Sequence, residues 1–139
     1  MIIVDANVIV KLALEEMHSH EARKFIYKIL LNGKEEITTV DIALAESLNA
    51  LWKHNAVIKD LTNKKFELAT NEILEFWGNL DKIPSDSIAN EAIKVAQRCN
   101  LTIYDSLYAA ASLQYKSPLF TFDRAVKEKA KRLGISLIE

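Results

Sequence analysis

The sequence has few of the residues that cross-link or break a chain. Its 139 residues include one cysteine, two prolines and three glycines. The single Cys99 excludes an internal disulfide and a cysteine-based metal site, and it points weakly to a reducing compartment. We expect it to be a small buried side chain. Because proline and glycine are scarce, no segment has the composition of a linker, and we expect one helix-rich domain spanning residues 1–139.

Neither sign of charge is in excess. The 18 lysines and arginines nearly balance the 19 aspartates and glutamates. No global positive field therefore draws the chain to nucleic acid, and a nucleic-acid partner must be held by a local basic patch. Long hydrophobic runs are also absent: the opening apolar stretch is too short to span a membrane and is interrupted by Asp5 and Lys11. It lacks a basic leader and a cleavage site, so we expect a cytoplasmic protein.

Several common catalytic motifs are missing. The sequence contains no G-x-x-x-x-G-K, no G-x-G-x-x-G and no G-x-S-x-G, so nucleotide-cradle and serine-hydrolase functions lack support. The three histidines, His18, His20 and His54, lie in polar or helix-surface contexts. We expect none of them to be catalytic.

Short apolar runs alternate with amphipathic segments along the chain. The strands predicted are residues 2–4, 36–40, a very short one around Ile83, 118–122 and 135–139. The helices predicted are one beginning near residue 7 and those at 19–33, 41–55, 60–80, 85–100, 102–116 and 123–134. The strand segments are continuously apolar, which is typical of a parallel sheet covered by helices on both faces. We therefore expect an α/β fold, with ligands bound beyond the carboxyl ends of the strands.

The same patterns predict buried helix faces and helix caps. Among the side chains expected in the core are Leu30, Trp52, Tyr104 and Tyr108. The residues expected only to cap helices are Asp41, Asp60 and Ser85.

Four acids fall where this sheet would bind a ligand. Asp5 follows the first strand, and Asp123 follows the strand at 118–122. Glu46 lies in the second turn of the helix after residues 36–40, and Asp105 joins the other three if its helix starts on the same side. Each acid alone has a structural explanation. Asp5 and Asp123 can be helix caps, Asp105 can close a capping box with Thr102, and Glu46 can be solvated.

Together the four acids indicate a metal site. Carboxylates that share a cleft repel one another, and without a cation at least one of them should have a raised pKa. Mg²⁺ and Mn²⁺ prefer oxygen ligands. One or two such ions can polarise a phosphoryl oxygen and activate a water molecule. The acids therefore predict metal-dependent phosphoryl chemistry.

Four segments carry a resemblance to a known family. "MIIVDANVIVKL", "AESLNALWK", "TIYDSLYAAAS" and "LFTFDRAVKEKAKRLGI" resemble, in this order, the four acidic motifs of the PIN-domain nucleases. The likeness is greatest to the VapC-like toxins of VapBC-type toxin–antitoxin pairs. It covers nearly the whole chain and is least in residues 57–84. It implies a three-layer α/β/α sandwich with a short, mainly parallel sheet, and cleavage of RNA with Mg²⁺ or Mn²⁺.

The resemblance also assigns roles to individual residues. Those that match the catalytic metal ligands are Asp5, Glu46, Asp105 and Asp123. Asn7 matches a small polar position that helps to hold the first aspartate or a water, and Thr121 matches a supporting hydroxyl. Ala125 and Val126 stand where some relatives carry a further acid, so no fifth ligand is expected. The family further implies a homodimer and a small antitoxin whose tail enters the cleft.

Other functions stay open at this point. Lys11, Lys53, Arg124 and Lys127 lie near the motifs and are candidates for RNA phosphate contacts, although a solvated surface explains each as well. A haloacid-dehalogenase-like phosphohydrolase needs an acid where Asn7 stands. The remaining alternatives are a PIN-fold ribonuclease of RNA processing without an antitoxin, and an inactive PIN fold that only binds.

Overall fold

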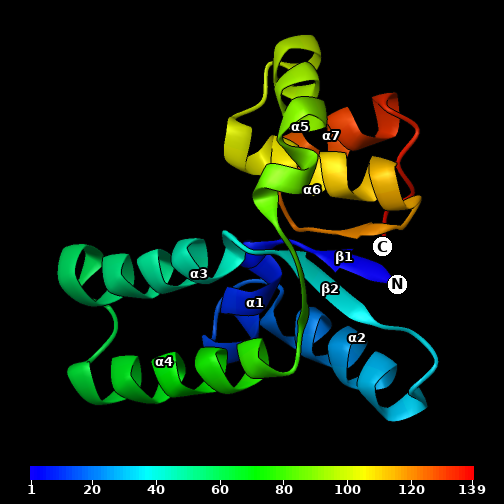
Figure 1. Ribbon diagram of the computed structural model, residues 1–139. Helices are drawn as coiled ribbons and strands as arrows, with labels where there is room; N and C mark the ends of the chain where they lie inside the picture. Colours follow the sequence, from blue (N-terminus) through cyan, green and yellow to red (C-terminus); the bar gives the residue numbers. More distant parts are fainter.

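A four-stranded parallel sheet lies between two layers of helices (Figure 1). The computed structural model describes all residues, 1–139. The strands are β1 (Ile2–Val4), β2 (Ile37–Val40), β3 (Asp81–Ile83) and β4 (Leu119–Phe120), in the order β3-β2-β1-β4. Strands β1, β2 and β4 are buried throughout, β2 including its two threonines, Thr38 and Thr39. The expected α/β/α sandwich is confirmed.

The strand order creates a switch point beside β1. Ile3 pairs with Thr38 of β2 on one side and with Leu119 of β4 on the other. The chain runs outward from β1 to β2 and β3, and then returns across the sheet to β4. Connections therefore leave β1 in opposite directions, and in such sheets a crevice forms at the carboxyl ends of the strands. In this molecule those ends lead to Asp5 and to the segment 121–123.

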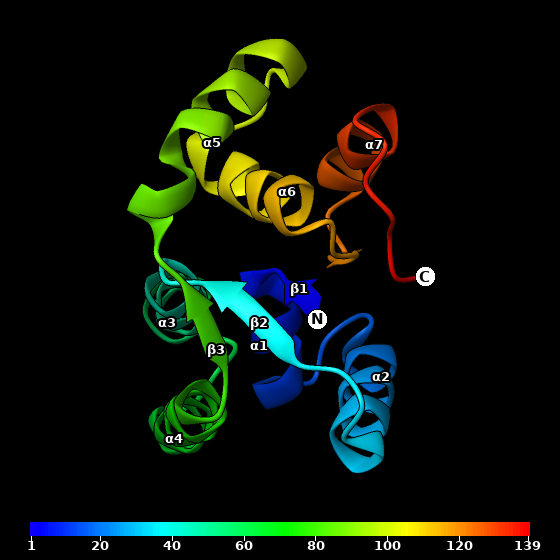
Figure 2. The same cartoon turned by 45° about the vertical axis from the view of Figure 1, so that its right-hand side comes forward.

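The helices divide between the two faces of the sheet (Figure 2). One layer contains α1 (Ala6–Ala13), α2 (Ser19–Asn32), α3 (Ala43–Trp52) and α4 (Asn63–Gly78), and the other contains α5 (Ser85–Cys99), α6 (Ile103–Tyr115) and α7 (Arg124–Arg132). Helix α1 packs on α2, α3 and α4, whereas α6 packs on β1, β2 and β4. A run of mostly small residues, Ser106–Ser112, is completely buried, which lets α6 lie close to the sheet.

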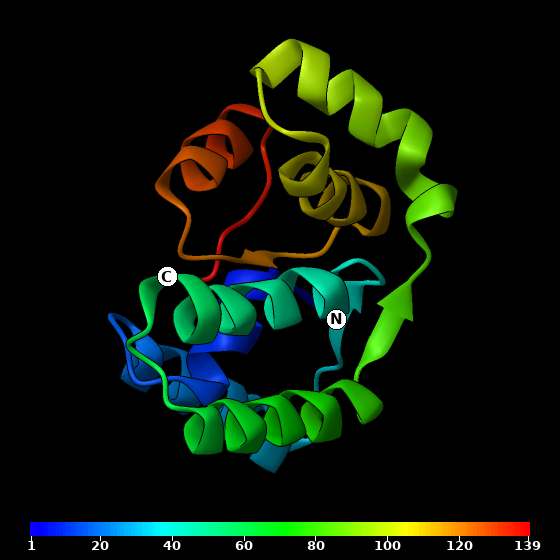
Figure 3. The ribbon, with the colours of Figure 1, turned by 90° about the vertical axis from the view of Figure 1, so that its left-hand side faces the viewer.

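Helices α3 and α4 run side by side and project from the sheet (Figure 3). A π-helical segment, η1 (Lys53–Ile58), extends α3. It ends at Lys59, whose φ of 61° places it in the left-handed region and turns the chain toward α4. Thr62 then caps α4 by accepting a hydrogen bond from the Lys65 N–H at 3.3 Å.

The predicted last strand is wrong. Only Leu137 forms a bridge, to Leu119, because β4 is two residues long and offers little edge to pair with. The predicted caps at Asp41, Asp60 and Ser85 are also wrong. Ser85 is the first residue of α5 and follows Pro84, while Asp60 contacts the His54 ring at 2.9 Å. Helix α3 begins after Ile42 with no side-chain cap.

Three side chains expected in the core are exposed. Leu30 is 53% exposed, Trp52 50% and Tyr104 60%. Leu30 and Trp52 each follow a buried residue, Ile29 and Leu51, and a step of one residue turns a helix by about 100°. Tyr104 lies in the exposed first turn of α6. Tyr108 is completely buried, as expected, while Cys99 is only half-buried. No helix is long and apolar enough to cross a membrane.

Candidate active site

Asp5 lies where β1 ends and α1 begins. Its backbone is extended (φ −78°, ψ 153°), and its Oδ1 accepts a hydrogen bond from the Asn7 N–H at 3.1 Å. Its Oδ2 accepts a hydrogen bond from the Thr121 hydroxyl at 2.8 Å. The residue is only 5% exposed. Asp5 is therefore a helix cap, as one explanation of the sequence predicted, but its second oxygen is held by the neighbouring strand segment.

Thr121 connects the ends of β1 and β4. Its hydroxyl donates to Asp5 and accepts from the Asn7 side-chain amide at 3.0 Å and from the Asp123 N–H at 3.1 Å. The Asn7 Oδ1 accepts a further bond from the Phe122 N–H at 3.1 Å. Thr121 is completely buried. This network fixes the orientation of Asp5 relative to the segment that carries Asp123.

Asp123 is exposed and caps α7. Its Oδ1 accepts a hydrogen bond from the Val126 N–H at 2.9 Å. A capping carboxylate at a helix N-terminus is stabilised by the unpaired N–H groups and the positive end of the helix dipole. The bond occupies one carboxylate oxygen, so Asp123 is held in place while facing solvent.

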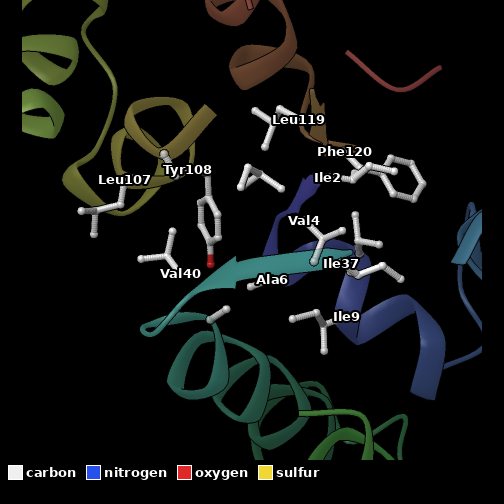
Figure 4. Packing of buried hydrophobic residues seen from close by; sticks show 14 of the residues in the cluster. Ile2, Val4, Ala6, Ile9, Ile37, Val40, Leu107, Tyr108, Leu119 and Phe120 are labelled. Carbon is white, nitrogen blue, oxygen red and sulfur yellow. The ribbon is translucent and has the colours of Figure 1, made fainter. Parts of the chain in front are cut away.

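Glu46 receives a hydrogen bond from across the sheet. In Figure 4 the Tyr108 side chain extends from α6 toward the strands, and its hydroxyl donates to Glu46 Oε1 at 2.6 Å. Burial, together with the charges of Asp5 and Glu46, raises the pKa of Tyr108, so the phenol stays a donor. Glu46 is half-buried, which makes the solvated explanation of this residue wrong. The sequence predicts Tyr108 only as a core residue and gives no signal for this contact with Glu46, 62 residues away.

Asp105 lies in the first turn of α6. Its N–H donates to the Thr102 hydroxyl at 3.1 Å, and that hydroxyl lies 2.9 Å from Asp105 Oδ2. Thr102 is therefore the expected cap of this helix. In a complete capping box the Asp105 carboxylate would accept a hydrogen bond from the Thr102 backbone N–H. Here the carboxylate accepts from the Thr102 hydroxyl instead, so the capping box is only partly formed. The residue is half-buried.

The four carboxylates influence one another electrostatically. Burial raises the pKa of Asp5 to about 7, and the charges of Glu46 and Asp105 add to this shift against the hydrogen bonds from Thr121 and Asn7. Burial and then the charge of Asp105 raise the pKa of Glu46, although its bond from Tyr108 opposes them. The pKa of Asp105 is raised by burial and by Asp123. Helix α6 therefore starts on the same side of the sheet as the other three acids.

No cationic side chain neutralises this cluster. None of the eight salt bridges in the structure involves any of the four acids. The donors are all carboxylate oxygens, which fits a hard divalent cation such as Mg²⁺ or Mn²⁺ in chemical type. No three His, Cys, Asp or Glu side chains are already gathered at metal-binding distance. The donor set therefore fits a metal, but its side chains must draw closer to hold one.

Comparison with known proteins identifies the family. The sequence model of the PIN domain matches residues 2–132. The chain belongs to the PIN-domain family. Ribonuclease VapC3 of Pyrobaculum aerophilum is 28% identical to this PIN domain over 131 residues, which cover 92% of this chain and 93% of the relative.

Two solved structures show the same fold. PAE2754 from Pyrobaculum aerophilum superimposes on the PIN domain with a TM-score of 0.74 and 22% identity, covering 98% of this chain and 82% of the other. A toxin–antitoxin complex from Klebsiella pneumoniae gives a TM-score of 0.61 and 14% identity, covering 88% and 87%.

The basic residues near the acids differ in their surroundings. In this PIN domain, Lys11 forms an ion pair with Glu16 at 2.7 Å, and its ammonium lies 5.6 Å from the centre of the Phe122 ring. Lys53 is exposed at the start of η1. Arg124 and Lys127 follow Asp123 on α7 and form no salt bridge. Their role as phosphate contacts stays a prediction.

The Thr121 network makes a prediction about stability. Thr121→Val should lower the free energy of unfolding by about 2 kcal/mol, because a methyl group of similar shape leaves the buried donors and acceptors around it unpaired. Thr121→Ser keeps the hydroxyl and is the matched control, with a smaller loss from the missing methyl. Urea unfolding measures both. Equal losses in the two variants would show that packing, not the hydroxyl, accounts for the effect.

Proposed function

We propose that this PIN domain is an endoribonuclease that requires Mg²⁺ or Mn²⁺ and cleaves RNA phosphodiesters with a water nucleophile. The observation that carries the proposal is the group of four electrostatically coupled carboxylates at the switch point of the sheet, with no cationic side chain to neutralise them. The similarity to ribonuclease VapC3 supports the choice of RNA as substrate.

In this proposal, Asp5, Glu46, Asp105 and Asp123 hold one or two ions. A bound divalent ion supplies Lewis acidity to a phosphoryl oxygen and lowers the pKa of a water molecule. Thr121 and Asn7 orient Asp5, and Tyr108 orients Glu46. Such outer partners normally fix the orientation of metal-binding side chains.

We further propose that the protein is the toxin of a toxin–antitoxin pair, acting in the cytoplasm as a homodimer and silenced by a small antitoxin. The similarity to VapC3 and to a chain of a toxin–antitoxin complex from Klebsiella pneumoniae supports this part. A short reading frame beside the gene, encoding a small protein that copurifies with this chain, is the expected observation. Purification of the chain alone and active, with no such neighbour, would favour a PIN ribonuclease without an antitoxin.

The proposal is tested with purified protein free of any antitoxin. A mixed pool of RNA should be cut internally when Mg²⁺ or Mn²⁺ is present, and cutting should stop when EDTA is added. The Asp105→Asn variant, carried through the same purification, controls for contaminating nucleases, because it changes this chain's proposed site and leaves any contaminant active. If the RNA pool stays intact both with Mg²⁺ and with Mn²⁺, the result would favour a PIN fold that binds without cutting.

A further inference from the structure

A groove opens beside the acidic site, between α2 and α7. Its volume is about 660 Å³, and its floor is formed by Phe25, Phe120 and Phe122. The rings pack together, with centroid distances of 4.7 Å between Phe25 and Phe120 and 5.2 Å between Phe120 and Phe122. Figure 2 shows α2 and α7 on either side of this edge of the molecule. None of the four acids lines the groove, but Phe122 and Arg124, the two chain neighbours of Asp123, both do, so one end of the groove adjoins Asp123.

The walls of the groove are basic. The cations that line it are Lys24 and Lys28 on α2 and Arg124, Lys127 and Lys131 on α7. The spacing of three or four residues places each set on one face of its helix. The two acids of the lining, Glu21 and Glu139, are paired with His18 and Lys131. The other four cations form no salt bridge, so this groove is a local positive patch on a chain whose net charge is −1.

A pair of stacked rings lies at the end of the groove nearest the acids. The His18 imidazole lies on the Phe122 ring with a centroid distance of 4.9 Å and an interplanar angle of 9°. The ammonium groups of Lys11 and Lys127 lie 5.6 and 5.7 Å from the centre of that ring. His18 has a φ of 69°, a conformation that is uncommon outside glycine and clusters at functional sites. Its side chain is 43% exposed, so a further flat group can stack against it.

We propose that this groove binds the single-stranded segment of RNA next to the scissile bond. Lys24, Lys28, Arg124 and Lys127 contact its phosphates, and the His18–Phe122 pair stacks on one of its bases. This inference rests on the proposed ribonuclease function and adds the form of the substrate. Stacking on a protein ring requires an unpaired base, which a duplex does not offer.

Binding is tested apart from cleavage by working in EDTA. Fluorescence anisotropy with a labelled ten-nucleotide single-stranded RNA gives Kd at several salt concentrations. The triple variant Lys24→Gln/Lys28→Gln/Lys127→Gln should bind at least about ten-fold more weakly. Each phosphate contact on a single strand contributes about 0.7 to the slope of log Kd against log salt. Loss of the three lysine contacts should therefore lower this slope by about 2. The control Lys64→Gln/Lys65→Gln/Lys94→Gln, on α4 and α5, makes the same change in charge and should bind like wild type.

The stacking pair needs a separate variant. His18→Asn removes the ring, and asparagine tolerates the left-handed backbone at this position. It should weaken binding about ten-fold without changing the salt slope, and His18→Tyr should restore most of the loss. A hairpin duplex of the same length should bind at least ten-fold more weakly than the single strand. Equal binding of the duplex would overturn the single-strand assignment.

The two proposals can fail independently. Wild-type affinity and salt slope in the triple lysine variant would overturn the groove assignment, even if the protein cuts RNA. Conversely, a protein that binds RNA through the groove but cuts nothing with Mg²⁺ or Mn²⁺ would retain the groove and lose the proposed ribonuclease function.

Discussion

Asp105→Asn should reduce the rate of RNA cleavage by about 100-fold or more. Loss of an outer partner of a metal ligand already costs 10–100-fold, and loss of a ligand itself should cost at least as much. Asparagine keeps an oxygen that can accept the Thr102 hydroxyl bond, and Asp105 is only half-buried, so the fold should be preserved. The free energy of unfolding should stay within about 1 kcal/mol, the scale of a charge at a helix N-terminus.

Asp41→Asn is the matched control for this variant. Asp41 also follows a strand at the carboxyl edge of the sheet, but it is exposed, and its N–H is bonded to the Ile83 carbonyl. Its substitution should leave cleavage unchanged. A second readout separates a metal ligand from a general structural role: the Mg²⁺ concentration that gives half the maximal rate should rise in Asp105→Asn. Wild-type cleavage by Asp105→Asn, or equal losses in both variants, would contradict the assignment.

The fold follows from the sequence because its central strands are short and buried on both faces. Residues 2–4 and 36–40 are predicted as strands, and the position after each strand then predicts the edge that carries the acids. The segment 135–139 misleads because an apolar run has the same composition whether it pairs or only packs. Its state depends on β4, which offers two residues for pairing. That length is set by the tertiary fold and not by the local sequence.

The candidate site is predictable in its acids and less so in its partners. Asp5 and Asp123 cap helices in the structure, and Asp105 lies in the first turn of one. Helix capping and the proposed metal binding therefore involve the same residues. Tyr108 lies 62 residues from Glu46, and its bond depends on how closely α6 approaches the sheet. The packing of His18 on Phe122 likewise joins segments that no local pattern connects. Asn7 and Thr121 also act through contacts between distant segments, and only the family resemblance points to them.

The burial of Asp5, to which the charges of Glu46 and Asp105 add, predicts how stability should depend on pH in the absence of metal. The folded-state pKa of Asp5 is about 7, against 3.8 for an unperturbed aspartate, so the folded state binds a proton more tightly than the unfolded state does. The stability that this proton contributes is fully present below about pH 4 and is lost as the pH rises through 7. Each unit of pKa difference corresponds to about 1.4 kcal/mol, so Asp5 contributes at most about 4 kcal/mol to this loss.

Asp5→Asn removes this titration and should change the pH profile in EDTA. Asparagine is also a good helix cap and keeps an acceptor for Thr121 or Asn7, so the variant should be more stable than wild type at pH 8. The difference should shrink as the pH falls toward 4, because wild-type Asp5 is then protonated. Added Mg²⁺ should stabilise the wild type more than the variant, since binding to the folded state raises its stability. Thermal unfolding across this pH range measures all three effects. A lower Tm for Asp5→Asn at pH 8 in EDTA would mean that the hydrogen bonds of the ionised Asp5 outweigh the cost of burying its charge and its repulsion by Glu46 and Asp105.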